Sequence, residues 1–179
     1  MEFQNLIESR RSIRVYDESK KVSREELEEL IKAATLAPSW KNSQVSRYYV
    51  AASQEAQEKV RKNLASFNDN NTKGAAALIV AAIVKERSGY ERDGSASTEL
   101  CHNEWGVFDN GLACQNLVLK AADMGLGSLI MGIRDAEGMK KDLELPDTEM
   151  ITAVIAVGYP KTEAVMPKRK AVEDVAKFL

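Results

Sequence analysis

Three arginines and one serine lie close together near the start of this 179-residue chain. They occur in the stretch "ESRRSIRVYD", which places Arg10, Arg11 and Arg14 around Ser12. Guanidinium groups and a hydroxyl suit a phosphate, because a phosphate accepts charge-assisted and bidentate hydrogen bonds. Alternatively, Arg10 and Arg11 end the first helix, where each cation interacts with the helix dipole by about 0.3–1 kcal/mol. The stretch alone leaves both interpretations open.

The arginines continue into an extended segment. In "SIRVY" the pattern alternates, which predicts Ile13 and Val15 on one face and Ser12 and Arg14 on the other. Ser12 and Arg14 would then project together, next to Arg10. This grouping favours an anion site but does not exclude an inert surface cluster.

A second basic cluster, "PKRK", occupies Pro167 to Lys170. Taken alone, it is typical of a solvated segment. Its acidic surroundings, Glu163, Glu173 and Asp174, argue against a nucleic-acid site. The two basic clusters could converge on one phosphate, and the sequence does not decide whether they do.

The composition indicates one globular domain over residues 1–179. The chain has 44% hydrophobic and 29% charged residues and a net charge of −2, so no overall field attracts nucleic acid or an anionic membrane. The N-terminus lacks the pattern of a signal peptide. The longest apolar run, Ala75 to Val84, is too short to span a bilayer. We therefore expect a cytoplasmic protein without nucleic-acid or membrane partners.

The cysteines and the histidine do not form a recognised motif. Cys101, His102 and Cys114 lack the spacing of a zinc site, so no metal is expected. Cys101 and His102 are adjacent and would point to different faces of a helix, which disfavours a nucleophile pair. "GLG" at Gly125 to Gly127 follows a helix and is no dinucleotide-binding motif, and the phosphate-binding "GxxxxGK[ST]" loop is absent.

The first half of the chain predicts helices that flank a short strand. A short amphipathic helix begins near Phe3, and a second runs from Arg24 to Leu36 behind a Ser23–Glu26 capping box. A strand is expected over 47–52 and a helix over 54–66. The stretches "LAPSWKNSQ" (36–44) and "NDNNTK" (68–73) are expected to be a capped loop and a turn.

Two segments, 75–84 and 150–158, are apolar on both faces and predict central strands. Between them, a long helix within 99–124 is apolar nearly all round, so it is buried in a large core or against another subunit. It ends at Gly125 and is followed by a strand at "SLIMG" and a helix over 135–143. The elements predict a mixed, mainly antiparallel sheet that is covered by helices on both faces.

Five motifs in this order resemble the FMN-dependent nitroreductase family. They are "RRSIRVYD", "APSWKNSQ", an "NxxK" before the "AALIVA" strand, "DNGLACQNLVLKAADMGLGS", and the late "PKRK". The resemblance extends over nearly the whole chain. It implies an α+β fold, the nitroreductase-like sandwich, assembled as an intertwined homodimer with two FMN sites at the subunit interface.

The family pattern implies which residues contact the FMN phosphate. By similarity, Arg10 and Ser12 hold it together with Lys168 and Lys170. Arg11 is an assisting residue whose role stays open. Which members of "PKRK" make the contacts is also open.

Other positions match family contacts to the flavin ring. Arg14 and Lys73 match basic positions near the pyrimidine edge, and Asn70 matches an amide there. Met131 and Gly132 fall where a backbone N–H approaches flavin N5. A second subunit is implied to contribute the loop that contains Pro38, Ser39 and Asn42.

The implied activity is that of an NAD(P)H-dependent oxidoreductase. Hydride passes from NAD(P)H to flavin N5 and then to an electron-poor acceptor such as a nitroaromatic or a quinone, in a ping-pong sequence. No side chain is implied to be catalytic, because the cofactor performs the chemistry. Arg14 and Lys73 would stabilise the negative charge of reduced FMN, and Asn70 offers both a donor and an acceptor to the ring edge.

The chain departs from the family pattern in two places. Relatives commonly have Pro-Trp after "NSQ", whereas this chain reads "NSQVSRYY", and Trp40 lies earlier in the loop. Trp40 either replaces that aromatic cover or simply packs. The insert around Gly89 to Ser97 is short, which favours an open pocket with loose acceptor specificity.

Two alternatives remain at this stage. One is a family relative with other reductive chemistry, such as dehalogenation, flavin fragmentation or enoate reduction. The other is an FMN-binding sensor or storage protein with little turnover. An open pocket over the flavin would favour an enzyme, whereas a pocket plugged by Trp40 or Phe108 would favour a binding protein.

Overall fold

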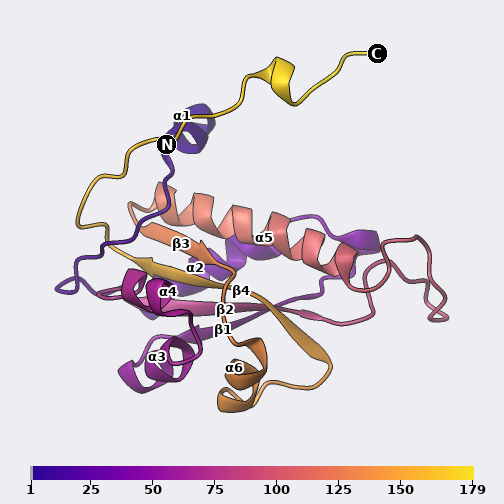
Figure 1. The fold of residues 1–179 in the computed structure, drawn as a ribbon, viewed down its shortest axis with the longest axis horizontal. Coiled ribbons are helices and arrows are strands. Elements are labelled where there is room, and N and C mark those ends of the chain that lie inside the picture. The colour runs from indigo at the N-terminus through magenta and orange to yellow at the C-terminus, as the bar shows by residue number, and fades with distance from the viewer. Residues whose placement is uncertain (1) are drawn as a thin grey trace.

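The computed structural model describes residues 2–179, and Figure 1 shows their arrangement. Elements labelled η are short 3₁₀-helices. In chain order the elements are α1 Phe3–Ser9, α2 Arg24–Thr35, η1 Trp40–Asn42, β1 Ser46–Ala51, α3 Gln54–Arg61, α4 Ser66–Asn71, β2 Ala77–Val84, α5 Glu104–Asp123, β3 Gly127–Met131, α6 Ala136–Asp142, β4 Glu149–Gly158 and η2 Val172–Asp174.

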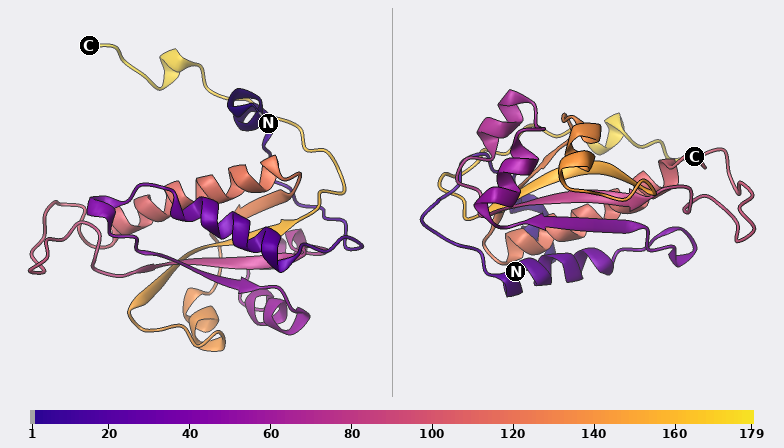
Figure 2. Two further views of the ribbon diagram at one scale, coloured as in Figure 1. Left: turned by 180° about the vertical axis from the view of Figure 1, so that it is seen from behind. Right: turned by 90° about the horizontal axis from the view of Figure 1, so that it is seen from below.

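The four strands form one sheet in the order β1-β2-β4-β3, and every neighbouring pair is antiparallel. A single parallel bridge joins Ser12 to Ser128 of β3. Figure 2 shows α2 and α5 on one face of the sheet, and α3 and α6 on the other. The prediction of an α+β fold with a mainly antiparallel sheet and helices on both faces is confirmed.

Strand β2 lies in the middle of two apolar cores because successive side chains of a strand point to opposite faces. Leu78 belongs to the core that contains Val60 of α3. Its neighbour Ile79 belongs to the core that contains Leu30 of α2 and Leu117 of α5. All five side chains are almost fully buried, and each such burial stabilises the fold by about 1.5–3 kcal/mol.

The predicted ends of the long helices are close to the observed ones. α2 begins with the predicted capping box: Glu26 N–H donates to Ser23 Oγ at 3.1 Å, and Ser23 N–H donates to Glu26 Oε2 at 2.7 Å. The helix ends at Thr35, before Pro38. Gly125 follows α5 with a φ of 75°, a left-handed conformation that lets the chain turn directly into β3.

The helix predicted over 54–66 is wrong beyond Arg61, where α3 ends. The chain turns there and begins a separate helix, α4, at Ser66. Asn63 explains the break, because its carbonyl accepts a hydrogen bond from Asp135 N–H at 2.8 Å instead of continuing the helix.

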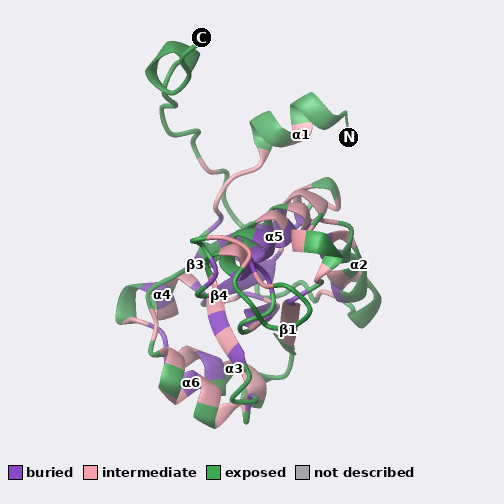
Figure 3. Cartoon of the chain, turned by 90° about the vertical axis from the view of Figure 1, so that its right-hand side faces the viewer, coloured by how far each residue is buried: buried purple, intermediate pink, exposed green. Residues whose placement is uncertain are grey.

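Two segments lie away from the sheet. Figure 3 shows α1 and the C-terminal segment projecting from the body of the molecule, mostly coloured as exposed. α1 contains no buried residue, and Phe3 and Phe178 are exposed.

The outer side of α5 is also uncovered, since Val107 is 44% and Phe108 56% exposed. None of the helices within residues 2–179 is long and apolar enough to cross a membrane.

Strand β3 begins at a close approach between Gly127 and Ile13. A Cβ atom on Gly127 would lie 2.7 Å from Ile13 Cγ1 and 2.9 Å from Ile13 Cβ. Contacts this short do not occur between real side chains, so glycine is required for the N-terminal segment to reach β3.

We predict that Gly127→Ala lowers the free energy of unfolding by about 1–3 kcal/mol, the usual range for an overpacked core. Urea unfolding followed by circular dichroism measures this loss. In an Ile13→Gly background the same substitution should be much less harmful, because the Cβ, Cγ1 and Cγ2 atoms that the new methyl group would meet are all gone. An equal loss in both backgrounds would contradict the packing explanation.

Candidate functional site

The segment that carries the arginines is held extended by backbone hydrogen bonds to two strands. Ile13 N–H donates to Ser128 O, near the start of β3, at 2.9 Å. Two residues after Ile13, Val15 O accepts a hydrogen bond at 3.0 Å from the N–H of Lys161, which lies just beyond the end of β4. The segment therefore crosses from β3 to the exit of β4, and its side chains line this edge of the sheet.

The predicted alternation is correct at Ile13 and wrong at Val15. Ile13 is buried, but Val15 is 46% exposed, and Tyr16 takes the inward position. The period of two is interrupted because the segment changes its partner from β3 to the residues after β4. Ser12 is half-buried and Arg14 is exposed, so both remain available to a ligand.

Three guanidinium groups meet at the start of this segment. Partial burial lowers the pKa of Arg10, and the nearby charges of Arg11 and Arg169 lower it further. Among residues 2–179, no carboxylate forms an ion pair with any of the three. Cations held together without an acidic partner suit an anion with more than one negative charge. The helix-dipole interpretation explains neither the partial burial of Arg10 nor the approach of Arg169.

The second basic cluster thus reaches the first through Arg169. Lys168 and Lys170 are exposed, and neither has an ion pair within the described part of the chain. Their assignment to a phosphate stays a prediction from the resemblance.

A cavity of about 550 Å³ opens beside Arg10 and Arg11. Three segments form its wall: the N-terminal segment, the turn between α5 and β3, and the residues that follow β4. The lining residues are Ser9, Arg10, Arg11, Ile13, Ala122, Gly125, Leu126, Gly127, Ser128 and Pro160 to Ala164.

The turn predicted over 68–73 is wrong, because most of it forms α4. Asn68 is buried and its side-chain amide donates to Ile133 O at 3.0 Å. Asp69 forms an ion pair with Arg61 of α3 at 2.7 Å. These two contacts hold α4 between α3 and the end of β3.

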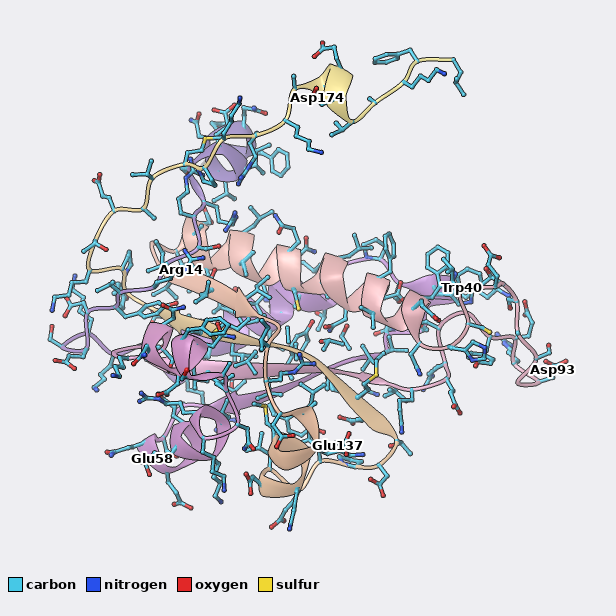
Figure 4. The ribbon with its side chains drawn as sticks, viewed as in Figure 1. Arg14, Trp40, Glu58, Asp93, Glu137 and Asp174 are labelled. Carbon is cyan, nitrogen blue, oxygen red and sulfur yellow. The ribbon has the colours of Figure 1, made fainter. Side chains whose placement is uncertain are left out.

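Asn70 and Lys73 are exposed. α4, which contains Asn70 and ends two residues before Lys73, lies on the same side of the molecule as Arg14 in Figure 4. The contact that places them is between backbones: a Cβ atom on Gly74 would lie only 2.9 Å from Tyr16 O. The residues that follow α4 therefore pass directly beside the arginine segment.

Strand β3 ends at Met131, whose side chain is buried in the core. Gly132 is exposed, and no atom lies within 4 Å of the position of a Cβ. Only the backbone of these two residues is therefore available to a ligand. The structure brings together, around the edge strand β3, Arg10, Arg11, Ser12, Arg14, Asn70, Lys73, Met131 and Gly132.

The loop with Pro38, Ser39 and Asn42 is not part of this group. Figure 4 shows Arg14 and Trp40 at opposite ends of the molecule. Within one chain the predicted residues therefore form two sets that lie far apart. The first set surrounds β3, and the second is this loop.

Asp109 of α5 holds this distant loop in place. Its buried carboxylate accepts hydrogen bonds from Trp40 N–H at 3.0 Å, Ser88 Oγ at 2.7 Å and Ser43 Oγ at 3.4 Å. Three residues of the loop have φ values between 45° and 56°: Lys41, Asn42 and Gln44. The loop needs an anchor because these left-handed conformations are unfavourable for non-glycine residues.

Trp40 packs on α5. Its ring centroid lies 4.9 Å from that of Trp105, and Phe108 contacts Trp105 edge-on at 5.3 Å. The indole N–H groups of both tryptophans are buried without a hydrogen-bond partner among the described residues. Trp40 therefore packs within its own chain, and its predicted role as an aromatic cover stays a prediction.

Sequence reasoning missed Asp109, although a signal was present. Asp109 and Asn110 are adjacent polar residues inside the mostly apolar stretch 105–114 of α5, and both are buried. Asn110 accepts a hydrogen bond from Thr152 Oγ1 at 2.6 Å and donates to Ser46 Oγ at 3.0 Å. A polar pair at such a position indicates an anchor for neighbouring segments.

The described residues offer no other reactive centre of the kinds considered above. Within residues 2–179, no group of three or more His, Cys, Asp or Glu could hold a metal ion. Cys101 and Cys114 are both buried, and burial raises the pKa of Cys114 to about 11. Cys114 is therefore a protonated thiol at neutral pH.

Comparison with known proteins agrees with this geometry. The Nitroreductase family model matches residues 7–159. The chain belongs to the nitroreductase family. Membership in this family supports an oxidoreductase.

Relatives of this nitroreductase-family chain cover it almost completely. A protein of Archaeoglobus fulgidus, provisionally named NADH dehydrogenase/NAD(P)H nitroreductase, is 33% identical over 88% of this chain and 85% of its own length. The crystal structure of a provisionally named nitroreductase from Exiguobacterium sibiricum, in complex with FMN, matches with a TM-score of 0.87 at 22% identity, covering 100% of this chain and 98% of that one. An enone reductase of gut-bacterial fatty acid saturation, CLA-ER, matches with a TM-score of 0.88 at 21% identity, covering 99% and 98%. At these identities the two structures show the shared fold.

We predict that Asp109→Ala lowers the free energy of unfolding by about 1–3 kcal/mol, because it leaves the Trp40 N–H and two hydroxyls without their acceptor. Amide hydrogen exchange at Trp40 should become faster, as measured by NMR or mass spectrometry. Ser43→Ala is the matched control, since it removes the bonds of the Ser43 hydroxyl to Asp109 and Ser88 but leaves the bond from Trp40 N–H to Asp109 in place. If both variants exchange equally fast, Asp109 is not the anchor.

Proposed function

We propose that this protein is an FMN-dependent oxidoreductase that takes hydride from NAD(P)H and passes it to a small electron-poor acceptor such as a nitroaromatic or a quinone. The observation that carries this proposal is that half-buried Arg10 feels the charges of Arg11 and Arg169, and that none of the three has an acidic partner among residues 2–179. Arg14 and Lys73 are exposed. The FMN in the Exiguobacterium structure and the NAD(P)H nitroreductase name of the Archaeoglobus relative support the choice of cofactor and reductant.

The cation cluster fits a phosphate monoester. A phosphate carries up to two negative charges at neutral pH and accepts several hydrogen bonds, which matches guanidinium donors and a hydroxyl. Arg169 joins the predicted set because its charge acts on Arg10. The residues that would hold the phosphate are Arg10, Arg11, Ser12, Lys168, Arg169 and Lys170.

The residues around the end of β3 would hold the flavin ring. Arg14 and Lys73 supply positive charge, which stabilises the negative charge of a reduced flavin. Asn70 supplies both a donor and an acceptor for the pyrimidine edge. The Met131–Gly132 backbone supplies an N–H toward N5. The chemistry that bound FMN supplies is hydride transfer, from NAD(P)H to N5 and on to the acceptor.

A second copy of the chain would complete the site. The loop with Pro38, Ser39 and Asn42 lies at the other end of the molecule from Arg14, so it would contact the flavin of a partner. Three surfaces are available for such a partner: α1, the C-terminal segment and the outer side of α5 with Val107 and Phe108. We therefore propose a homodimer with FMN at the subunit interface.

The acceptor class is proposed from the residues near the aromatic cluster. The 89–97 insert beside this cluster is short, which favours turnover with several acceptors over a closed binding protein. The acceptor panel should include an enone, since an enone reductase shares the fold.

We predict that the purified protein binds FMN and that NADH or NADPH bleaches its visible absorption without oxygen. A nitroaromatic, a quinone or an enone should then restore the colour. Arg10→Ala should raise the Kd for FMN about tenfold or more, because a charge-assisted hydrogen bond contributes about 1.5–3 kcal/mol. Its free energy of unfolding should change by less than about 0.5 kcal/mol.

Arg24→Ala is the control, because Arg24 is an exposed arginine that pairs only with Glu28 on α2. It should leave the Kd for FMN unchanged. A protein that takes up no FMN would contradict the proposal, and bound flavin that NAD(P)H does not bleach would favour a sensor or storage protein. Equal losses of FMN affinity and stability in Arg10→Ala would restore the helix-dipole interpretation.

We further predict complementation between two defective chains. Arg14→Ala and Asn42→Ala homodimers should each bind FMN weakly, because every site contains one substitution. A mixed dimer, purified through two different tags, has one site with both substitutions and one with neither, so it should recover about half of the wild-type binding capacity. A mixed dimer as weak as both homodimers, or a monomer in analytical ultracentrifugation, would contradict a shared site.

A further inference from the structure

Arg134 is a half-buried cation that lies two residues beyond Gly132. Its Nη1 donates to Gly132 O and its Nη2 donates to Ile151 O. Its Nε is buried without a hydrogen-bond partner, and no carboxylate in the described part of the chain forms an ion pair with it. Withdrawing such a charge from water is unfavourable unless other contacts or a bound group compensate for it.

The two carbonyls that Arg134 holds belong to different strands. β3 pairs with β4 only from Met131, opposite Val154, to Gly127, opposite Gly158. Ile151 belongs to the part of β4 that β3 does not reach. The guanidinium therefore continues the connection between the strands beyond the last pair of the ladder, at the point where the chain leaves β3.

Gly132 needs such a connection more than its neighbours do. It has no side chain, which makes its backbone conformationally permissive, and no atom beyond its chain neighbours lies within 4 Å of the position of a Cβ. The following residues are held by others: Ile133 O accepts from Asn68 Nδ2 at 3.0 Å, and Asp135 N–H donates to Asn63 O at 2.8 Å. The hydrogen bond from Arg134 adds the Gly132 carbonyl to these contacts, and it thereby fixes the orientation of the backbone at Gly132.

We propose that Arg134 is a positioning residue of the flavin site, which fixes the Met131–Gly132 backbone toward N5 and contributes an unneutralised positive charge that favours the reduced flavin. This inference rests on the function proposed above. Arg14 and Lys73 are exposed, so water and salt screen their charges. Arg134 is half-buried, and a charge in a region of lower dielectric constant acts more strongly on a nearby group.

The test is the reduction potential of bound FMN, measured in the full-length protein by anaerobic titration against a reference dye. Arg134→Met removes the charge and all donors, so the potential should shift to a more negative value. The rate of flavin reduction by NAD(P)H should fall about tenfold, a typical effect of removing a supporting partner. Arg134→Lys keeps the charge but replaces the planar two-nitrogen fork with a single ammonium, which holds the two carbonyls less rigidly. Its potential should stay near that of the wild type while flavin reduction slows.

Lys140→Met is the matched control. The Lys140 side chain is only 16% exposed, but it is neutralised by Asp147 at 2.8 Å. Its removal should leave the potential unchanged. A role that is only structural would lower the stability of Arg134→Met without moving the potential of the FMN that it binds.

The outcomes separate this inference from the proposed function. Wild-type protein that binds no FMN would overturn both. Wild-type and Arg134→Met proteins that bind FMN at equal potentials would overturn the role of the charge alone. If Arg134→Met does not fold, Arg134→Lys decides: slowed reduction at a near wild-type potential supports the proposal, and a wild-type rate overturns the positioning role.

Discussion

The pairing of the arginine segment with the ends of β3 and β4 is the constraint on which the rest of the structure depends. Ile13 bonds to Ser128 and packs on Gly127, and Val15 bonds to Lys161 shortly afterwards. These contacts connect the start of the chain with residues more than a hundred positions away. The charges of the N-terminal segment are therefore placed by backbone hydrogen bonds, which leave the side chains themselves free for a ligand.

Two charges of opposite sign, one buried and one half-buried, hold the irregular backbone at the two ends of the sheet. Asp109 accepts hydrogen bonds from a backbone N–H and two hydroxyls, and so stabilises a loop with three left-handed residues. Arg134 gathers two carbonyls and stabilises the exit from β3. In each case one ionised group satisfies several partners at once, because charge-assisted hydrogen bonds are stronger than neutral ones. The sheet between them acts as a rigid spacer that keeps the two sets of proposed flavin contacts apart within one chain.

Local patterns predicted most of the fold, since they depend on neighbours in the sequence. The Ser23 capping box, the Gly125 turn and the strands that are apolar on both faces are of this kind. The break after α3, the exposure of Val15 and the approach of Arg169 to Arg10 all arise from contacts between distant segments, which no local pattern encodes. The site residues followed from the resemblance, whereas their division into two sets became visible only in three dimensions.

The stacking of Trp40 on Trp105 has an optical consequence. The chain contains two tryptophans, and they lie 4.9 Å apart at the end of α5. All indole emission of the protein therefore originates from one place, where the loop that Asp109 anchors contacts the start of α5. With a yellow chromophore bound next to that loop, the emission would be quenched by energy transfer, and its return would report the departure of the chromophore in real time. The protein thus contains an intrinsic fluorescent probe of the loop that would join the two subunits.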